Sequence, residues 1–97
     1  MVTIEQIQDA VAEAAPSHNV RAAWLFGSYA RGEADEQSDV DIAVEGGPGF
    51  SLFDALFLEE ALEGALNVPC DVSNPRAFKP RVRRGFDADK RVLYEAH

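Results

Sequence analysis

Cysteine and long apolar runs are nearly absent from this chain of 97 residues. Cys70 is the only cysteine, so no internal disulfide can form, and it is expected to be a small buried hydrophobic residue. No apolar run approaches the roughly 20 residues of a membrane-spanning helix. Residues 1–5 lack the basic and apolar regions of a secretory signal. These absences argue against a disulfide-stabilised or membrane protein and predict a cytoplasmic one.

Basic residues are scarce in most of the chain. Residues 1–75 contain fourteen acidic residues and only two basic ones, whereas residues 76–97 contain seven basic and three acidic residues, for a formal net charge of −8. The acidic balance argues against general nucleic-acid binding, because phosphate backbones would be repelled. The basic run, residues 76–91, has three interpretations that the sequence leaves open: a solvated face, a docking surface for an acidic partner, or a contact with RNA.

The patterns that are present alternate between helix and strand within one domain, residues 1–97. Helical spacing and capping residues predict helices over residues 4–15, 28–31, 52–66 and 75–86, the last interrupted at Pro80. Apolar or alternating runs predict strands over residues 20–26, 39–44, 68–72 and 91–95. This order predicts an α/β (α+β) fold, in which a small mixed sheet of about four strands has helices packed on one face.

The aromatic and leucine-rich segments are expected to form the core. The helix over residues 52–66 has apolar residues at helical spacing and should carry much of that core through Leu52, Phe53, Leu56, Phe57, Leu62 and Leu66. Trp24 lies inside a predicted strand and is interpreted as a core residue, with stacking on a nucleobase as the alternative.

Three aspartates are the candidate metal ligands. Asp39 and Asp41 lie two positions apart on a predicted strand, so their side chains share the face opposite Val40 and Ile42. Two carboxylates this close repel each other unless a cation lies between them, and Mg²⁺ prefers such oxygen ligands. If the strand with Asp71 lies beside this one, the three carboxylates meet on the open face and could hold two ions.

A glycine-serine turn supplies the candidate phosphate site. Gly27 follows a buried strand, and its turn allows backbone N–H groups to approach an anion closely. The Ser28 hydroxyl can donate a hydrogen bond to a phosphate oxygen. Arg31, one helical turn later, could either reach phosphate or hold the loop against the acidic strand.

These two motifs together resemble the signature of the minimal nucleotidyltransferases, which belong to the DNA polymerase β-like superfamily. The pattern Gly-Ser-x-Ala-Arg-Gly begins at Gly27, and after five further residues Ser-Asp-x-Asp begins at Ser38. The resemblance extends to the third acidic strand around Asp71 and to the closing segment, residues 92–95. Residues 85–90 depart from it as an insertion-like stretch.

The resemblance implies the reaction and the role of each residue. Gly27 and Ser28 would hold the β- and γ-phosphates of ATP, with Arg31 and Ser38 as further candidates for phosphate contact. Asp39 and Asp41 would bind both metal ions, and Asp71 would complete one metal site and take the proton of the acceptor hydroxyl. AMP would be transferred by in-line attack on the α-phosphorus, with pyrophosphate leaving.

Members of this size resemble the antitoxins of toxin–antitoxin pairs. The resemblance implies that AMP is transferred from ATP to a tyrosine of a partner HEPN ribonuclease toxin, with which the chain would form a hetero-oligomer. Two alternatives remain open: an adenylyltransferase that acts on a small-molecule hydroxyl such as that of an aminoglycoside, and an inactive domain that only binds its partner.

Overall fold

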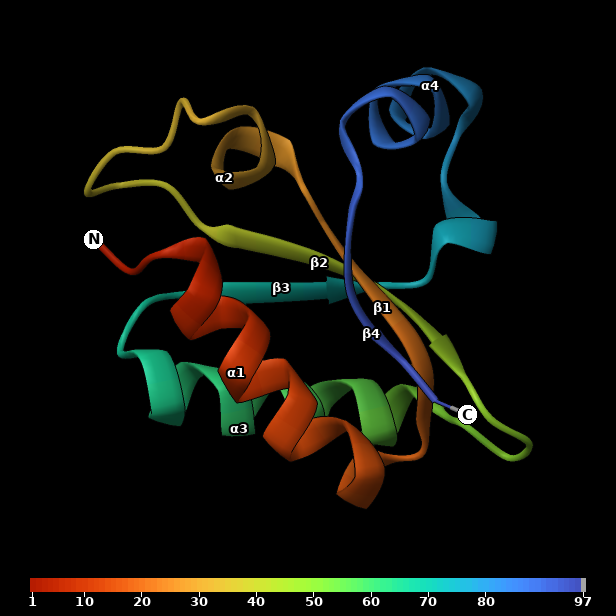
Figure 1. The fold of residues 1–97 in the computed structure, drawn as a ribbon. Coiled ribbons are helices and arrows are strands. Elements are labelled where there is room, and N and C mark those ends of the chain that lie inside the picture. The colour runs from red at the N-terminus through yellow and green to blue at the C-terminus, as the bar shows by residue number, and fades with distance from the viewer. Residues whose placement is uncertain (97) are drawn as a thin grey trace.

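A four-stranded sheet forms the centre of the chain, which the computed structural model describes for residues 1–96 (Figure 1). In chain order the elements are α1 (Ile4–Ala14), the 3-10 turn η1 (Ala15–His18), β1 (Val20–Phe26), α2 (Gly27–Arg31), β2 (Val40–Gly46), α3 (Leu52–Leu66), β3 (Cys70–Ser73), the 3-10 turn η2 (Pro75–Ala77), α4 (Pro80–Asp89) and β4 (Arg91–Glu95). The predicted α/β fold with a mixed four-stranded sheet is therefore confirmed.

The elements differ from the predicted ones mainly near two prolines. Pro80 does not interrupt a helix but begins α4, because proline fits the first helical turn, where its missing N–H costs no hydrogen bond. Residues 85–90, which looked like an insertion, form the second half of that helix and the residue after it. Pro69 precedes β3, which consequently begins at Cys70 rather than at residue 68.

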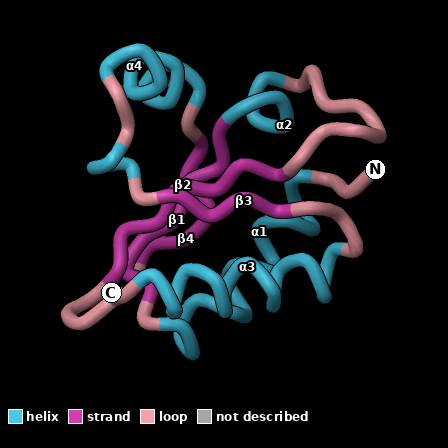
Figure 2. The backbone as a smooth tube through the Cα atoms, turned by 180° about the vertical axis from the view of Figure 1, so that it is seen from behind, coloured by secondary structure: helices cyan, strands magenta, loops and turns pink. Residues whose placement is uncertain are grey.

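The strand order is β3-β2-β1-β4, with β1 antiparallel to both β2 and β4 (Figure 2). β2 and β3 are parallel, and α3 connects them as the crossover helix. The parallel pair has Asp41 in register with Asp71. Two acidic strands that are separated by a helix in the sequence therefore lie side by side.

One face of the sheet is covered by α1 and α3 (Figure 1). Alternation along β2 directs Val40, Ile42 and Val44 into this layer, where they pack with Leu25 of β1 and with helix residues in one continuous core. The largest fully buried side chains belong to this cluster: Ile7, Leu25, Ile42, Leu58, Leu62, Val11 and Val40. The same alternation directs Asp41 to the opposite face.

The beginning of α3 contributes less to the core than its sequence suggests. Leu52, Phe53 and Phe57 are 75%, 69% and 56% exposed, whereas Leu58, Leu62 and Leu66 are buried. Apolar residues surround the first two turns of α3, and only one stripe of a helix can face the sheet. The expectation that Leu52, Phe53, Leu56 and Phe57 carry the core is therefore wrong.

Two glutamates on α3 bind the outer edge of the sheet. Glu63 Oε2 accepts a hydrogen bond of 3.0 Å from the backbone N–H of Cys70, and Glu59 Oε1 accepts one of 3.0 Å from that of Val72. These backbone groups belong to β3, the edge strand, and would otherwise have no partner strand. The carboxylates thus attach the crossover helix to the strand that bears Asp71.

Aromatic residues anchor α4 on the opposite face. Phe86 is buried and makes edge-to-face contacts with Trp24 and Phe26 of β1, whose ring centroids lie 6.1 and 5.4 Å away. The sequence predicts that Trp24 belongs to the core, but the main core does not include it. Trp24 is instead half-buried beneath α4. Among residues 1–96, no helix is long and apolar enough to cross a membrane.

We predict that replacement of a buried leucine of α3 destabilises the protein and that replacement of an exposed one does not. Leu62→Ala removes a fully buried side chain and should lower the free energy of unfolding by about 2–5 kcal/mol. Leu52→Ala, on the exposed side of the same helix, should change it by less than about 0.5 kcal/mol. Urea unfolding followed by circular dichroism measures both. Equal losses would contradict the placement of α3.

Candidate active site

The acidic residues of β2 and β3 lie on the face of the sheet that α1 and α3 leave open. Asp41 is half-buried on β2, and its Cα partner on the parallel strand is Asp71, which is exposed. Asp39 is exposed at the position before β2 begins. Val40 and Ile42 are fully buried on the other face, as the predicted alternation requires. The structure thus places Asp41 beside Asp71 and puts Asp39 at the entry to the same strand.

Burial and the charges of two neighbouring aspartates act on Asp41. The pKa of Asp41 is raised to about 6, first by burial and then by the negative charges of Asp71 and Asp39, while Arg31 opposes the rise. Within residues 1–96, however, no three His, Cys, Asp or Glu side chains are gathered tightly enough to enclose a metal ion by themselves. The donor set fits Mg²⁺ in the form in which proteins commonly bind it, with one or two carboxylates plus substrate phosphates.

Gly27 lies directly against Asp41. It has a backbone angle φ of 74°, which side chains other than glycine rarely adopt, and it stands between β1 and α2. A Cβ atom at this position would collide with Asp41 Oδ2 and lie 3.1 Å from Asp41 Cγ. The glycine therefore allows the carboxylate and the loop backbone to come into contact, and it brings the glycine-serine turn to the acidic cluster.

Ser28, Arg31 and Ser38 surround this turn in different ways. Ser28 follows Gly27 and is partly exposed. Arg31 Nε donates to Glu33 Oε1 at 2.8 Å and Arg31 Nη1 to Asp89 Oδ2 at 3.2 Å, and these bonds raise the pKa of the guanidinium. Arg31 therefore connects the loop after α2 to the end of α4, and neither of these partners belongs to the acidic strand β2.

Ser38 closes the turn that leads into β2. Its hydroxyl accepts a hydrogen bond of 2.9 Å from the backbone N–H of Asp35 and donates one of 3.2 Å to Asp35 Oδ1. The Ser38 N–H also donates to the Asp35 carbonyl at 3.1 Å. This turn leads directly to Asp39 and β2.

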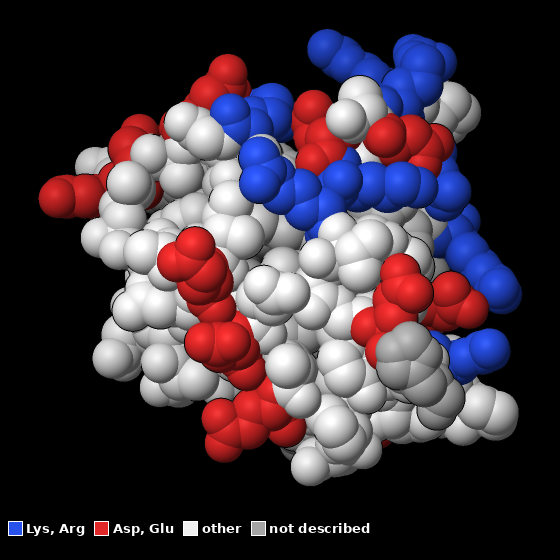
Figure 3. Space-filling view, viewed as in Figure 1, with Lys and Arg blue, Asp and Glu red and all other residues white. Residues whose placement is uncertain are grey.

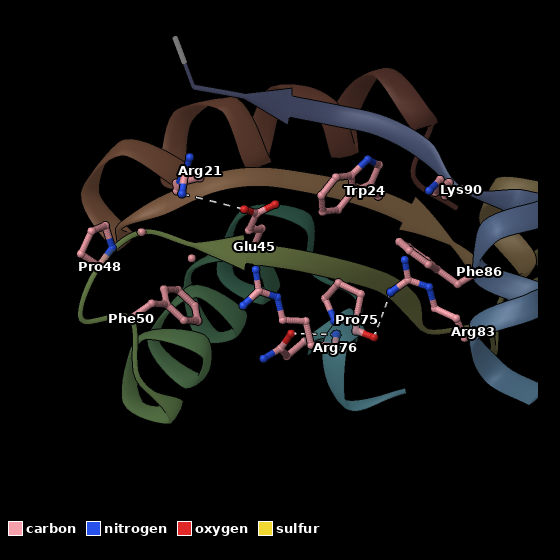
Figure 4. Close-up of a pocket in the computed structure, with 13 residues that line it drawn as sticks. Arg21, Trp24, Glu45, Pro48, Phe50, Pro75, Arg76, Arg83, Phe86 and Lys90 are labelled. Atoms are coloured by element: carbon pink, nitrogen blue, oxygen red, sulfur yellow. Dashed lines mark hydrogen bonds and ion pairs between the residues drawn. The ribbon is translucent and has the colours of Figure 1, made fainter. Parts of the chain in front are cut away.

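A cavity of about 520 Å³ lies on the same open face (Figure 4). Its lining includes Trp24 and Glu45 from the sheet, Arg76 from η2, and Arg83 and Phe86 from α4. Sequence reasoning did not identify this cavity. The signal was available in the alternation of β1, which directs Trp24 away from its buried neighbours Ala23 and Leu25, together with the basic run that follows β3.

The basic run gathers over α4 and its neighbours, whereas acidic side chains form separate patches on this view, the rest of which is mostly uncharged (Figure 3). Arg83 and Lys90 both bind Asp87, at 3.2 and 3.3 Å, and Arg91 donates to the Ala30 carbonyl at 3.1 Å. Part of the run therefore serves the fold. The side chains of Lys79, Arg81 and Arg84 are exposed.

Comparison with known proteins identifies the type of domain. A family model described as "Nucleotidyltransferase domain" matches residues 4–94. The protein adenylyltransferase MntA of Thermococcus cleftensis is 36% identical over 88 residues, which cover 87% of this chain and 89% of that protein.

Solved structures share the fold. One of a "putative minimal nucleotidyltransferase" is 35% identical, covers 93% of this chain and 95% of its own, and has a TM-score of 0.77. A tri-AMPylated HEPN toxin of Shewanella oneidensis in complex with an MNT antitoxin contains a chain with a TM-score of 0.72 and 18% identity, covering 97% of this chain and 74% of that one.

We predict that Asp41→Asn stabilises the metal-free protein in a pH-dependent way. Because the folded pKa of about 6 exceeds the unfolded value of 3.8, the folded protein binds more protons, and stability falls as the pH rises through this interval. The variant lacks this penalty, which at pH 8 is at most about 3 kcal/mol and smaller where solvent screens the half-buried charge.

Urea unfolding in EDTA at pH 8, 6 and 4 tests this. The stability difference between variant and wild type should be largest at pH 8 and should nearly disappear at pH 4. Asp54→Asn cannot serve as a control because Asp54 caps α3, but Asp9→Asn, on the exposed side of α1, should leave the difference near zero throughout. A pH-independent difference for Asp41→Asn would contradict the raised pKa of Asp41.

Proposed function

Because this chain belongs to the nucleotidyltransferase domain family, we propose that it transfers AMP from ATP to a tyrosine hydroxyl of a HEPN-domain ribonuclease toxin and acts as its cytoplasmic antitoxin. The chain is a nucleotidyltransferase by family. The observation that carries the proposal is the contact between Gly27, in the glycine-serine turn, and Asp41. Asp41 is in turn in register with Asp71 on β3. This contact joins a candidate phosphate site to a candidate metal site on one open face.

The aspartates would hold the metal together with the triphosphate. Asp39 and Asp41 would bind Mg²⁺, with Asp71 completing one of two sites. Bound Mg²⁺ supplies neutralisation of the phosphate charges in this type of transfer. The raised pKa of Asp41 supports this assignment, because a carboxylate whose charge is destabilised by burial and by acidic neighbours gains most from a nearby cation.

The glycine-serine turn would position the leaving group. Gly27 has no side chain to separate its backbone from the acidic cluster, and the Ser28 hydroxyl is available as a donor to the β- or γ-phosphate. Arg31 already binds two carboxylates, so it would stabilise the loop around the phosphates and reach them only if those bonds rearrange. Ser38 would act through the turn that leads to Asp39.

Transfer would then proceed by in-line displacement. The acceptor hydroxyl attacks the α-phosphorus from the side opposite the pyrophosphate, and its proton passes to Asp71. Little covalent chemistry falls to the protein, so positioning and charge neutralisation supply the rate. Asp71 is suited to the proton transfer because it is exposed beside Asp41 on the edge strand, where an acceptor can reach it.

The nature of the acceptor is inferred from the relatives. The Thermococcus protein is named for protein adenylylation, and a structural neighbour is the antitoxin bound to an AMPylated HEPN toxin. A partner protein as acceptor agrees with a site that lies on an open sheet face. The two alternatives are an adenylyltransferase for a small-molecule hydroxyl and an inactive antitoxin that only binds its toxin.

We predict that the chain labels its HEPN partner with AMP in a reaction that requires the aspartates. With radiolabelled ATP, Mg²⁺ and a HEPN-domain toxin as the candidate partner, wild type should label the partner. Asp39→Ala/Asp41→Ala should lower the rate by at least about a thousandfold, because charge stabilisation of this kind dominates the barrier. Aminoglycosides in place of the partner should remain unlabelled. Equal labelling by the double variant would remove the enzymatic assignment.

We also predict that Gly27→Ala abolishes ATP binding, because the added Cβ displaces the Asp41 carboxylate and φ becomes strained. Gly85→Ala is the matched control: nothing lies within 4 Å of a Cβ at this helical position, so binding should persist and stability should not fall. Calorimetric titration with a non-hydrolysable ATP analogue and Mg²⁺ measures both. Full binding by Gly27→Ala would place the triphosphate elsewhere.

A further inference from the structure

The cavity on the open face has a lining that suits an anion with a flat ring. Four of its side chains are basic, Arg21, Arg76, Arg83 and Lys90, and one is acidic, Glu45, in a chain whose net charge is −8. Trp24 and Phe86 add aromatic surface. Its volume of about 520 Å³ lies within the usual range for small-molecule sites.

Most of the basic groups already have partners, but one does not. Arg83 and Lys90 share Asp87, and Arg21 lies 3.9 Å from Glu45. Arg76 forms no ion pair with any of residues 1–96, although it projects from η2 into the cavity (Figure 4). A guanidinium that has no ion-pair partner of its own is a ready site for a phosphate group, which it can bind through two parallel hydrogen bonds.

The position of the cavity relates it to the reaction. Along β2, Asp41 is followed on the same face by residue 43 and then by Glu45, which lines the cavity. The glycine-serine turn lies at the other side of Asp41, at the end of β1. In-line displacement requires the leaving group and the attacking group to lie on opposite sides of the phosphorus. With pyrophosphate at the turn, the cavity lies on the side of Asp41 away from the leaving group, where an acceptor would approach.

We propose that this cavity is a second nucleotide-binding site, which holds a nucleoside monophosphate on the acceptor side of the catalytic aspartates. Arg76 binds its phosphate, and the base lies against Trp24, since stacking on an aromatic ring stabilises any base. The ligand is either free AMP or an AMP unit already attached to the acceptor. The acceptor-side placement rests on the proposed function, whereas binding itself does not.

An attached unit would support a second transfer. A ribose hydroxyl oxygen of that AMP forms a bond to the α-phosphorus of a new ATP, and the bond from this phosphorus to the bridging oxygen of the pyrophosphate breaks. The hydroxyl proton leaves to Asp71, and pyrophosphate departs. Free AMP in the same cavity would instead occupy the acceptor path and slow the transfer.

Trp24 is the only tryptophan, so its fluorescence reports on the cavity directly. Titration of the full chain with AMP in EDTA should change this fluorescence saturably, and Arg76→Gln should weaken the binding by about tenfold or more. Arg81→Gln, an exposed residue of α4 outside the cavity, is the matched control and should bind as wild type does.

Several outcomes would overturn the proposal. The absence of a saturable change with AMP would eliminate a nucleotide site. Binding of inorganic phosphate or of adenosine as tight as that of AMP would also eliminate it. Loss of AMP binding when Mg²⁺ and a non-hydrolysable ATP analogue saturate the protein would show that there is one nucleotide site, not two. None of these measurements requires transfer, so failure here is distinct from failure of the proposed function.

Intact mass measurement of the HEPN partner after reaction with excess ATP distinguishes the two sources. The cavity is assigned to an attached unit if the partner carries two or more AMP units and the fraction of such molecules falls with Arg76→Gln but not with Arg81→Gln. A partner with one unit, together with inhibition of transfer by added AMP over the concentration range of the fluorescence change, assigns it to free AMP. Absence of both effects would contradict the acceptor-side placement.

Discussion

The burial of the Asp41 carboxylate beside two other aspartates is the constraint on which the rest of this site depends. Asp41 is half-buried, is paired in register with Asp71 and follows Asp39 by two residues, and its pKa rises to about 6 as a result. A fold gains nothing from this arrangement on its own, since neighbouring like charges and a buried carboxylate both cost free energy. The cost is understandable if the site is completed by a cation and a triphosphate.

The supporting structure keeps these charges in place. Gly27 allows the turn after β1 to touch the Asp41 carboxylate, Ser38 closes the turn that leads to Asp39, and Glu59 and Glu63 attach β3 to its crossover helix. Each of these contacts is local in space but joins different elements. Alignment of the three aspartates therefore depends on both connections of β2, the one before it and the one after it.

Much of the fold and of the candidate site could be predicted from the sequence, because both follow from residue periodicity and from backbone chemistry. Alternation in residues 39–44 sorts Val40 and Ile42 from Asp39 and Asp41, and the glycine at 27 marks the turn. The exposure of Leu52 and Phe53 could not be predicted, because a helix that is apolar on all sides gives no sign of which stripe meets the sheet. The placement of Trp24 depends on α4, a distant segment, which covers the second face through Phe86.

The two glutamates of α3 have a further consequence for how copies of this chain can assemble. The exposed backbone N–H and C=O groups of an edge strand can pair with a strand from another molecule. Such pairing is a common route to sheet extension and amyloid growth. On β3 the donors of Cys70 and Val72 are occupied by carboxylates, whose charge would also repel an acidic neighbour. Lateral growth of the sheet through β3 is thereby opposed, so association at this edge must use side-chain surfaces instead.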